Sequence, residues 1–499
     1  MTLVADHAQL YRALRSRDRR FEGSFIAGIT STRIYCRPGC PAKTPRAENV
    51  RFFACAAAAE ESGFRACLRC RPDASALLPA AAGSSATVAR ALALFAQGTN
   101  EGGLAALCDK LGVGERHLRR LFLQHLGASP HAVLRTQRLQ FARSLLEQTS
   151  LPMTEVALAS GYRSTRRFNA EIQQAFHAPP SALRQGPRSR KSASRAAASD
   201  RLELRIPFAP PLDWAALLKF FAARAIEGVE SVQGQRYARS VRLPGTTAPQ
   251  ILEVELAPER DALLVCTALS PALGLPALVA GVRRMFGCGV APATVAEHLR
   301  RDPLLARALA KHPGLRVPGA WDPFELAVRA LLGQQISVRA AQTLAGRLVR
   351  AFGEPLAGAP AAGNPTHLFP APRAIAEAGA LALAKLGILP ARAAALGALA
   401  SAVDSGALDF ETLRYRPLDE ACAALESLRG FGPWSAHYIA MRALGEPDAF
   451  PLRDLGLLRA LRRENPEATF TDLRERAEHW RPFRATAAIA LWLLDGETT

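Results

Sequence analysis

The stretch IYCRPGCPAKTPRAENVRFF, from Ile34 to Phe53, places two cysteines four positions apart, ahead of a basic loop. A second pair follows in FRACLRC, so that four cysteines lie within 35 residues: Cys36, Cys40, Cys67 and Cys70. Each pair can place two sulfur atoms on one tetrahedral ion, and the loop between the pairs closes the site. The spacing therefore predicts one zinc ion bound by four cysteines, with disulfides or a chance pattern as alternatives.

The composition of the chain favours a polyanion as its partner. Its 499 residues are enough for about three or four domains, and 49% of them are hydrophobic, which supports sizeable cores. The formal charge of +19 favours DNA, because lysine and arginine displace the counterions that condense on phosphates. A membrane surface is the competing polyanion.

Three features bear on the compartment. The first twenty residues lack an apolar signal region and are typical of a polar helix. The uncharged stretch 262–282 contains Pro271, Gly274 and Pro276, so we expect a buried strand and then a helix rather than a membrane span. Nine cysteines, an odd number, do not suggest a secreted disulfide framework, and we expect the five outside the two pairs to be core thiols. We therefore expect a cytoplasmic, DNA-associated bacterial protein that binds no membrane.

Two shifts in composition divide the chain. The first is Leu77–Thr87, LLPAAAGSSAT, which consists mainly of small residues and is expected to be flexible. The second is Arg184–Arg201, RQGPRSRKSASRAAASDR, which is typical of a basic tether. Residues 87–183 between them have helical periodicity. Beyond the tether we expect strands, then mainly helices from about residue 286, with one helix among the strands over 212–226. The strands are expected over 202–208, 236–243, 250–256 and 262–269.

The residues around the cysteines resemble the N-terminal domain of the Ada adaptive-response family. The matching stretches are YCRPGCPAKTPRAENVRFF and GFRACLRCRPD. In that family the first zinc-bound cysteine takes a methyl group from a methyl phosphotriester in DNA, which implies that Cys36 is the acceptor. Zinc keeps a sulfur deprotonated at neutral pH, as such a transfer needs. We expect Arg33, Arg37 and Arg46 to hold phosphates. The alternative is a purely structural zinc under a solvated basic surface.

The helical middle contains two similar units. LAALCDKLGVGERHLRRLFLQHLG (Leu104–Gly127) is typical of helix, glycine turn and helix, and MTEVALASGYRSTRRFNAEIQQAF (Met153–Phe176) repeats the arrangement. Their second helices carry Arg116, Arg120, Arg163 and Arg166. The pair of units resembles the AraC-type DNA-binding domain, which implies that these arginines contact DNA in the major groove. A helical bundle with a charged outer face is the alternative.

The stretch LESLRGFGPWSAHYIAMRA (Leu425–Ala443) is a second chemical centre. Gly430 and Gly432 predict a tight hairpin between two helices, and Pro433 suits a first helical position. Amides at such a helix N-terminus can bind a DNA phosphate without base specificity. Downstream, Asp454 is expected at a helix start, where capping preference alone makes it a plain N-cap.

Hairpin, glycine/proline loop and aspartate together resemble the HhH-GPD DNA glycosylases, and within them the AlkA-type 3-methyladenine DNA glycosylases. Similar stretches extend over most of 202–495, including FELAVRALLGQQISVRAA and HWRPFRATAAIALWLL. The resemblance implies that Asp454 is the catalytic carboxylate and that the strand-rich part is a TBP-like lobe. It also implies that Trp434, Tyr438 and Trp492 stack on a flipped base, although core packing is the commoner role for such residues.

Three further details of the sequence bear on these resemblances. The family's DNA-wedge position follows LLGQ, where AlkA has a leucine and this chain has Gln335 followed by Ile336. GPWSAHY contains no lysine that could act as a nucleophile, which favours a monofunctional glycosylase without lyase action. The PCHR-type active site of the O6-alkylguanine transferase domain does not occur in the sequence.

We therefore predict a multidomain α+β protein with one zinc ion. Its predicted parts are a small four-cysteine zinc domain (1–78), an all-α double helix-turn-helix domain (85–184), a basic linker (185–200), a TBP-like α/β lobe (201–285) and an all-α helix-hairpin-helix glycosylase domain (286–499). The predicted function is an alkylation-damage response: methyl acceptance from DNA phosphotriesters, transcription regulation and excision of bases such as 3-methyladenine. The expected partners are alkylated and promoter double-stranded DNA and RNA polymerase, bound by a monomer. The alternative is a DNA-binding transcription regulator whose glycosylase half is inactive.

Overall fold

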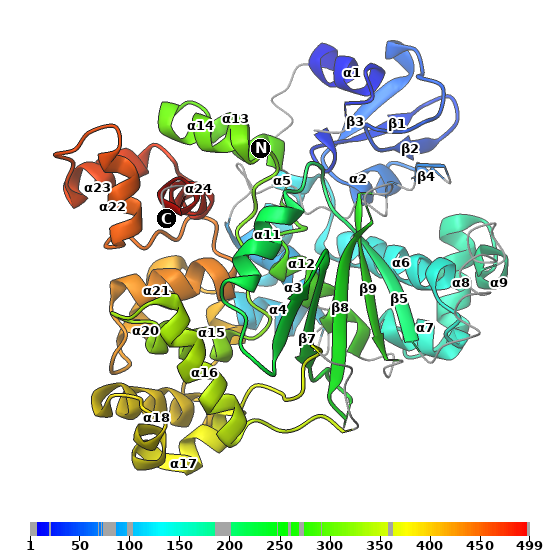
Figure 1. The fold of residues 1–499 in the computed structure, drawn as a ribbon. Helices are drawn as coiled ribbons and strands as arrows, with labels where there is room; N and C mark the ends of the chain where they lie inside the picture. The colour runs from blue at the N-terminus through cyan, green and yellow to red at the C-terminus, as the bar shows by residue number, and fades with distance from the viewer. Residues whose placement is uncertain are drawn as a thin grey trace.

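Two β-sheets organise the chain, and helices pack beside and between them in the computed structural model (Figure 1). The structure describes residues 7–18, 21–67, 69–70, 72, 86–96, 103–184, 201–246, 248–257, 261–268, 274–290, 292–357 and 363–496. The multidomain α+β fold that the sequence predicts is confirmed. The expected tether lies outside the described residues over 185–200, as does most of the flexible stretch 77–87.

The N-terminal part is a small four-stranded sheet. Its elements are α1 (His7–Arg15), β1 (Ile26–Ile29), β2 (Ile34–Cys36), η2 (Ala47–Asn49), β3 (Val50–Phe53), α2 (Ala56–Glu61) and β4 (Arg65–Ala66). The sheet order is β3-β1-β2-β4, with β1 antiparallel to both neighbours and β2 parallel to β4. Because Tyr35 pairs with Ala66, the ends of β2 and β4 lie side by side, and one cysteine pair begins at each end.

The middle of the chain consists of helices: α3 (Ala86–Ala96), α4 (Gly103–Leu111), α5 (Glu115–Leu126), α6 (Pro130–Gln148), α7 (Met153–Ala159), α8 (Thr165–Phe176) and α9 (Pro180–Arg184). The helices α4 and α5 form the first helix-turn-helix unit, and α7 and α8 form the second. Gly127 ends α5 in the left-handed conformation, and Ser164 caps α8 by accepting a hydrogen bond from the Arg167 amide. The long helix α6 joins the two units.

The second sheet is antiparallel throughout, in the order β5-β9-β8-β7-β6. Its strands are β5 (Arg201–Pro207), β6 (Glu230–Gln233), β7 (Arg236–Val241), β8 (Gln250–Ala257) and β9 (Ala262–Ala268), and α11 (Trp214–Ala222) and α12 (Leu275–Met285) pack against it. The four strands and the helix expected from the sequence are present. The sequence pattern does not predict β6, a short edge strand with little apolar alternation. The stretch 262–282 begins with β9 and continues into α12.

The C-terminal part is helical. Its elements are α13 (Pro292–Leu299), α14 (Pro303–Lys311), α15 (Pro323–Leu332), α16 (Val338–Phe352), α17 (Pro372–Lys385), α18 (Pro390–Asp404), α19 (Phe410–Leu413), α20 (Leu418–Glu426), α21 (Pro433–Ile439), the π-helical turn η5 (Ala440–Leu444), α22 (Leu455–Arg462), α23 (Phe470–Glu478) and α24 (Arg484–Gly496). The expected hairpin lies between α20 and α21, and Pro433 opens α21. No helix among the described residues is both long and apolar enough to cross a membrane.

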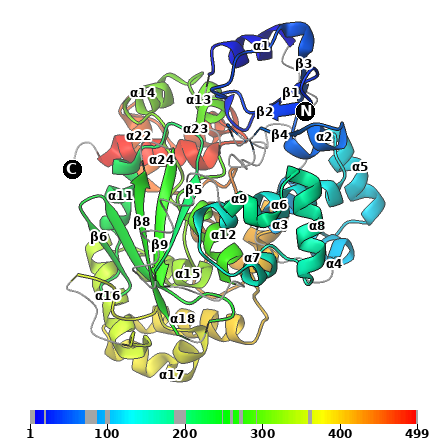
Figure 2. The same cartoon turned by 90° about the vertical axis from the view of Figure 1, so that its right-hand side faces the viewer.

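Shared apolar cores join these parts. One core combines α2 of the N-terminal sheet with α3, α5 and α6, and includes Tyr415 from the C-terminal part. A second core combines α6, α7 and α8 with the strands of the second sheet. Figure 1 shows α6 and α7 beside β5, and Figure 2 shows the same parts from the side. The helix-turn-helix units are therefore packed between the small sheet and the large one.

Candidate metal centre and carboxylate site

The four paired cysteines gather at one end of the small sheet. Cys36 ends β2, Cys67 follows β4, and all four side chains are buried. Their sulfur atoms lie within 4.8 Å of one another. The loop between the first two cysteines is held by the buried Glu22, whose Oε1 accepts a hydrogen bond from the Gly39 amide at 3.2 Å and lies 3.3 Å from Arg37 Nη1.

This donor set fits zinc. Four sulfur atoms around one zinc ion are separated by about 3.8 Å in a regular tetrahedron, and observed separations of no more than 4.8 Å are compatible with that size. Hydrogen bonds that the Cys36 thiol makes with Cys40, Cys67 and Cys70 raise the pKa of Cys36, because sulfur atoms crowded this closely disfavour a further thiolate. A divalent cation lowers that penalty, because it neutralises two of the four negative charges. The other five cysteines are free thiols; Cys108, Cys288 and Cys422 are buried in the core as expected, whereas Cys55 and Cys266 are half-buried.

The arginines near the cysteines are not equivalent. Arg46 is exposed, with an 85% accessible side chain, and approaches Glu48 only to 3.9 Å. Arg33 is exposed and stands over the Phe64 ring. Arg37 is paired with Glu22, which offsets part of its charge. Arg33 and Arg46 are therefore the better placed of the three to meet a phosphate.

The four arginines singled out in the helix-turn-helix units are exposed. Arg116 and Arg120 lie one turn apart on α5, where Arg120 contacts the His117 ring at 3.0 Å. Arg163 and Arg166 lie at the N-terminus of α8. Both pairs thus belong to a second helix or its start, and that helix is the element that enters the major groove in helix-turn-helix proteins.

The hairpin before α21 is tied to the loop that follows α15. Gly430 has a φ of +88°, and a Cβ there would lie 2.8 Å from Ala395 Cβ, so both conformation and space favour glycine. Gln334 Nε2 donates to the Gly430 carbonyl at 2.8 Å. The next residue, Gln335, is exposed with a φ of +57°, whereas Ile336 is half-buried. Gln335 therefore stands at the tip of this loop, beside the hairpin.

Asp454 caps α22 and at the same time faces two indoles. Its Oδ1 accepts hydrogen bonds from the amides of Gly456 (2.8 Å) and Leu457 (3.1 Å) and from Trp492 Nε1 (3.0 Å). Its Oδ2 accepts from Trp434 Nε1 at 2.9 Å. Asp454 is therefore both the N-cap of α22, as capping preference predicts, and the carboxylate of the aromatic site. Among the described residues, Oδ2 is the oxygen that retains capacity for a further hydrogen bond.

Three half-buried aromatic rings surround this carboxylate. Trp434 and Tyr438 stack, with ring centroids 5.1 Å apart and an interplanar angle of 9°. The ring centroids of Tyr438 and Trp492 are 6.2 Å apart, and their planes are tilted by 57°. The structure thus brings together the aspartate and the three aromatic residues that the sequence singled out. The sequence predicts only a stacking role for the indoles, and nothing in it indicates that both N–H groups point at Asp454.

Three further residues, at the far edge of Tyr438, are not predicted from the sequence. Arg442 Nη1 donates to the Tyr438 hydroxyl at 2.5 Å, and its guanidinium stands over the Phe220 ring at 4.7 Å. Arg224 covers the same ring at 3.9 Å. Burial raises the pKa of Tyr438, but the charges of Arg442 and Arg224 outweigh burial and lower it. Phe220 lies in α11 of the other lobe and Arg224 just after it, so no local pattern connects them with the hairpin.

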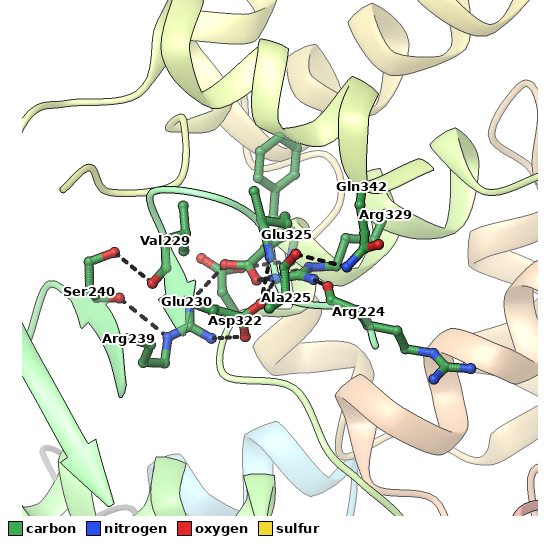
Figure 3. A network of polar contacts seen from close by, with 12 residues as sticks. Arg224, Ala225, Val229, Glu230, Arg239, Ser240, Asp322, Glu325, Arg329 and Gln342 are labelled. Carbon is green, nitrogen blue, oxygen red and sulfur yellow. Dashed lines mark hydrogen bonds and ion pairs between the residues drawn. The ribbon is translucent and has the colours of Figure 1, made fainter. Parts of the chain in front are cut away.

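A buried ionic network fixes the two lobes of this site to one another (Figure 3). Arg239 of β7 donates to Glu325 of α15 at 2.8 Å, and Arg329 of α15 contacts both Glu325 and Glu230 at 2.5 Å. Arg329 Nη1 also donates to the Arg224 carbonyl at 2.7 Å. An unpaired charge in the protein interior costs much free energy. The network therefore strongly favours this one arrangement of the two lobes.

Comparisons with known proteins agree with this division. Residues 9–73 match the metal binding domain of Ada, 107–186 a helix-turn-helix domain, 203–322 the AlkA N-terminal domain, and 328–484 the HhH-GPD superfamily of base excision DNA repair proteins. Fold, sites and matches together define an HhH-GPD DNA glycosylase joined to a zinc-binding and helix-turn-helix half. The four buried cysteines accordingly hold one zinc ion.

A relative from Mycobacterium tuberculosis, "Probable bifunctional transcriptional activator/DNA repair enzyme AlkA", is 39% identical over 492 residues, 98% of this chain and 96% of that protein. The chain belongs to this family of bifunctional transcriptional activator/DNA repair enzymes. "DNA-3-methyladenine glycosylase 2" of Escherichia coli is 32% identical over 287 residues, 58% of this chain and 95% of that protein. The structure of a 3-methyladenine DNA-glycosylase from Archaeoglobus fulgidus shares the fold, with a TM-score of 0.52 at 24% identity over 59% of this chain and 99% of its own.

Proposed function

We propose that the C-terminal half excises alkylated bases such as 3-methyladenine by hydrolysis of the N-glycosidic bond. The observation that carries this proposal is the Asp454 carboxylate, which two indole N–H groups and two backbone amides hold in a half-buried aromatic site. Such a carboxylate stays fixed while positive charge develops on a sugar. The aromatic faces beside it suit a flipped base, above all a cationic one.

The proposed reaction follows from these positions. As the C1′–N bond breaks, its electron pair leaves with the base and neutralises the positive charge that alkylation placed there. Asp454 Oδ2 stabilises the cationic sugar or orients a water molecule, whose oxygen bonds to C1′ and whose proton passes to the carboxylate or to solvent. GPWSAHY offers no lysine for a covalent intermediate, which supports a monofunctional glycosylase. Gln335 is the side chain we propose to fill the gap left in the DNA stack.

For the N-terminal half we propose a second, single-turnover reaction at Cys36. The zinc ion keeps the four sulfurs deprotonated. The Cys36 sulfur attacks the methyl carbon of a methyl phosphotriester, an S–C bond forms, the O–C bond breaks, and the phosphodiester leaves with its negative charge. Arg33 and Arg46 are placed to hold the neighbouring phosphates. The buried sulfur cluster lies beside exposed basic side chains, and this arrangement supports the proposal.

The helix-turn-helix units complete the proposed response. We propose that they bind promoter DNA through Arg116, Arg120, Arg163 and Arg166 and act with RNA polymerase. We also propose that the protein is a cytoplasmic monomer and that its domains have the boundaries predicted from the sequence. Methylation of Cys36 removes one negative charge from the zinc site, and this weakens the electrostatic repulsion between the site and the DNA backbone.

One assay tests the glycosylase proposal. Alkylated duplex DNA is incubated with the full chain, and free 3-methyladenine is measured by chromatography. Release by the wild type with loss in Asp454→Asn is expected. If both proteins bind DNA equally and the wild type releases no base, the result would favour a regulator with an inactive glycosylase half.

A further inference from the structure

The helix-turn-helix half and the glycosylase half are packed against one another at two separate places. At the first place, α6, α7 and α8 share an apolar core with the strands of the second sheet. There the Gln148 side chain of α6 accepts a hydrogen bond from the Arg205 N–H of β5 at 2.7 Å and donates one to the Arg205 carbonyl at 3.4 Å. At the second place, Tyr415 of the C-terminal part is 3% exposed and lies in the core of α3, α4 and α5. Because each contact prevents rotation about the other, the two halves keep one relative orientation.

The arginines of the first helix-turn-helix unit face away from this packing. Leu118 and Phe122 of α5 are fully buried in the core that also contains Tyr415. Arg116 lies two positions before Leu118, and Arg120 lies two positions before Phe122. Two positions on an α-helix correspond to a rotation of about 200°. Arg116 and Arg120 are exposed and therefore project from the face of α5 opposite the glycosylase half.

The second unit has the same orientation. Phe168 and Ile172 of α8 are fully buried in the core that contains the strands of the second sheet. Arg166 is exposed two positions before Phe168, so it projects from the face of α8 opposite this core. Arg163 is exposed just before the N-cap Ser164. In both units, the arginines proposed to bind promoter DNA are thus turned away from the glycosylase half.

The proposed DNA-binding surface of the glycosylase half lies on another side of the molecule. It consists of the hairpin between α20 and α21 and of Gln335 in the loop between α15 and α16. Figure 1 shows α15, α20 and α21 on the left and α8 on the right, with the second sheet between them. A duplex much shorter than its persistence length of about 150 base pairs is nearly straight and follows one side of a protein. One such duplex therefore cannot reach both surfaces.

We propose that the chain binds two separate segments of double-stranded DNA at the same time, one on the arginine faces of α5 and α8 and one on the hairpin and Gln335. The inference rests on the proposed DNA-binding roles of the two halves. The formal charge of +19 supports two such partners, because each segment brings its own phosphates. The protein can then excise a damaged base from one segment while it remains bound to a promoter on the other.

The test uses the full chain and three duplexes of about 25 base pairs, a length that stays nearly straight. The first is selected from a random-sequence pool by the full chain. The second carries a tetrahydrofuran analogue of an abasic site, which mimics the reaction product and is not hydrolysed. The third carries both features. Fluorescence anisotropy measures the affinity for the first duplex with and without a saturating amount of the second, at about 0.2 M salt to weaken non-specific binding. Native mass spectrometry counts the duplexes bound to each chain.

We expect saturation with the abasic duplex to change the affinity for the selected duplex by less than about twofold, since distant sites act independently. Complexes of one chain with both duplexes should form. The third duplex should bind no more tightly than the better of the other two, because it cannot engage both surfaces. The double variant Arg116→Gln and Arg166→Gln should bind the selected duplex at least about tenfold more weakly. Arg307→Gln is the matched control, because Arg307 is an exposed arginine of α14 that pairs with Glu464, and it should keep both affinities.

The outcomes separate the inference from the proposed function. Displacement of the selected duplex by the abasic duplex overturns the inference and leaves both DNA-binding roles intact. A gain of more than about tenfold for the third duplex does the same, because a single segment then engages both surfaces. If either duplex fails to bind alone, or if the double variant keeps the wild-type affinity, the proposed DNA-binding role of that half is wrong, and the inference is wrong with it.

Discussion

The four-cysteine centre and the Asp454 site differ in how far apart their parts lie in the sequence. The metal centre is complete within 35 residues, on two adjacent strand ends. The Asp454 site draws its indoles from 20 positions upstream and 38 positions downstream, and Phe220 and Arg224 from another lobe. The metal centre therefore depends on a small sheet and one ion, whereas the carboxylate site depends on the packing of the whole C-terminal half.

Removal of zinc should give the largest effect and should separate the two sites completely. With the metal chelated, four crowded thiols no longer hold the small sheet, and we expect loss of methyl transfer and unfolding of roughly the first 75 residues. Base release should continue, because the helix α22, which Asp454 caps, packs in a separate core. Methyl transfer to protein, free base and circular dichroism measure the three outcomes. Methyl transfer that survives complete zinc removal would show that the activated-thiolate account is wrong.

Asp454→Asn should have the next largest effect, confined to the other site. Asparagine keeps an oxygen for the helix cap but loses the charge, so we expect base release to fall by about 10²–10³-fold. Methyl transfer to Cys36 should be unchanged. Asp409→Asn is the control, since Asp409 caps α19 through the Glu411 amide away from the aromatic rings. Comparable base release by the Asp454 variant would remove the catalytic assignment.

Trp434→Phe and Trp492→Phe distinguish stacking from support of the carboxylate. Phenylalanine keeps an aromatic face but loses the N–H that bonds Asp454, so we expect about tenfold slower base release with unchanged non-specific DNA binding. Trp480→Phe is the matched control, because the Trp480 indole donates to Asp302 at 2.9 Å in the same domain. Full activity in both phenylalanine variants, with loss of base release in Trp434→Ala and Trp492→Ala, would support stacking alone.

Gly456→Ala should have the smallest effect of this series. A Cβ there would lie 3.0 Å from Asp454 Oδ1 and 3.2 Å from Trp492 Cδ1, so the carboxylate and the indole must separate slightly. We expect base release to slow by about fivefold, as when a charge-assisted hydrogen bond is weakened. Gly397→Ala, with nothing within 4 Å of its Cβ, controls for the substitution itself. An unchanged rate would show that the site tolerates small shifts of Asp454.

The sequence was most informative where function depends on local spacing. The cysteine pairs, the helix-turn-helix units and the hairpin with Pro433 are all patterns of short range, and the structure has the corresponding elements. Asp454 and the three aromatic residues were found through a family resemblance, and the structure brings them together. The residues missed, such as Arg442 and Phe220, carry no local signature, because each acts through a neighbour distant in the sequence.

The amino-acid sequence alone determined the cysteine ligand set, the order of the parts and the residue types available for chemistry. These follow from short-range spacing and from the periodicity of apolar residues, which are properties of neighbouring positions. Only the tertiary structure decided that both indoles donate to Asp454, that Glu60 bridges Tyr35 and Thr136, and that α6 reaches β5. The physical reason is that hydrogen bonds and shared cores depend on distances in space, which the packing of complete domains sets and local sequence does not.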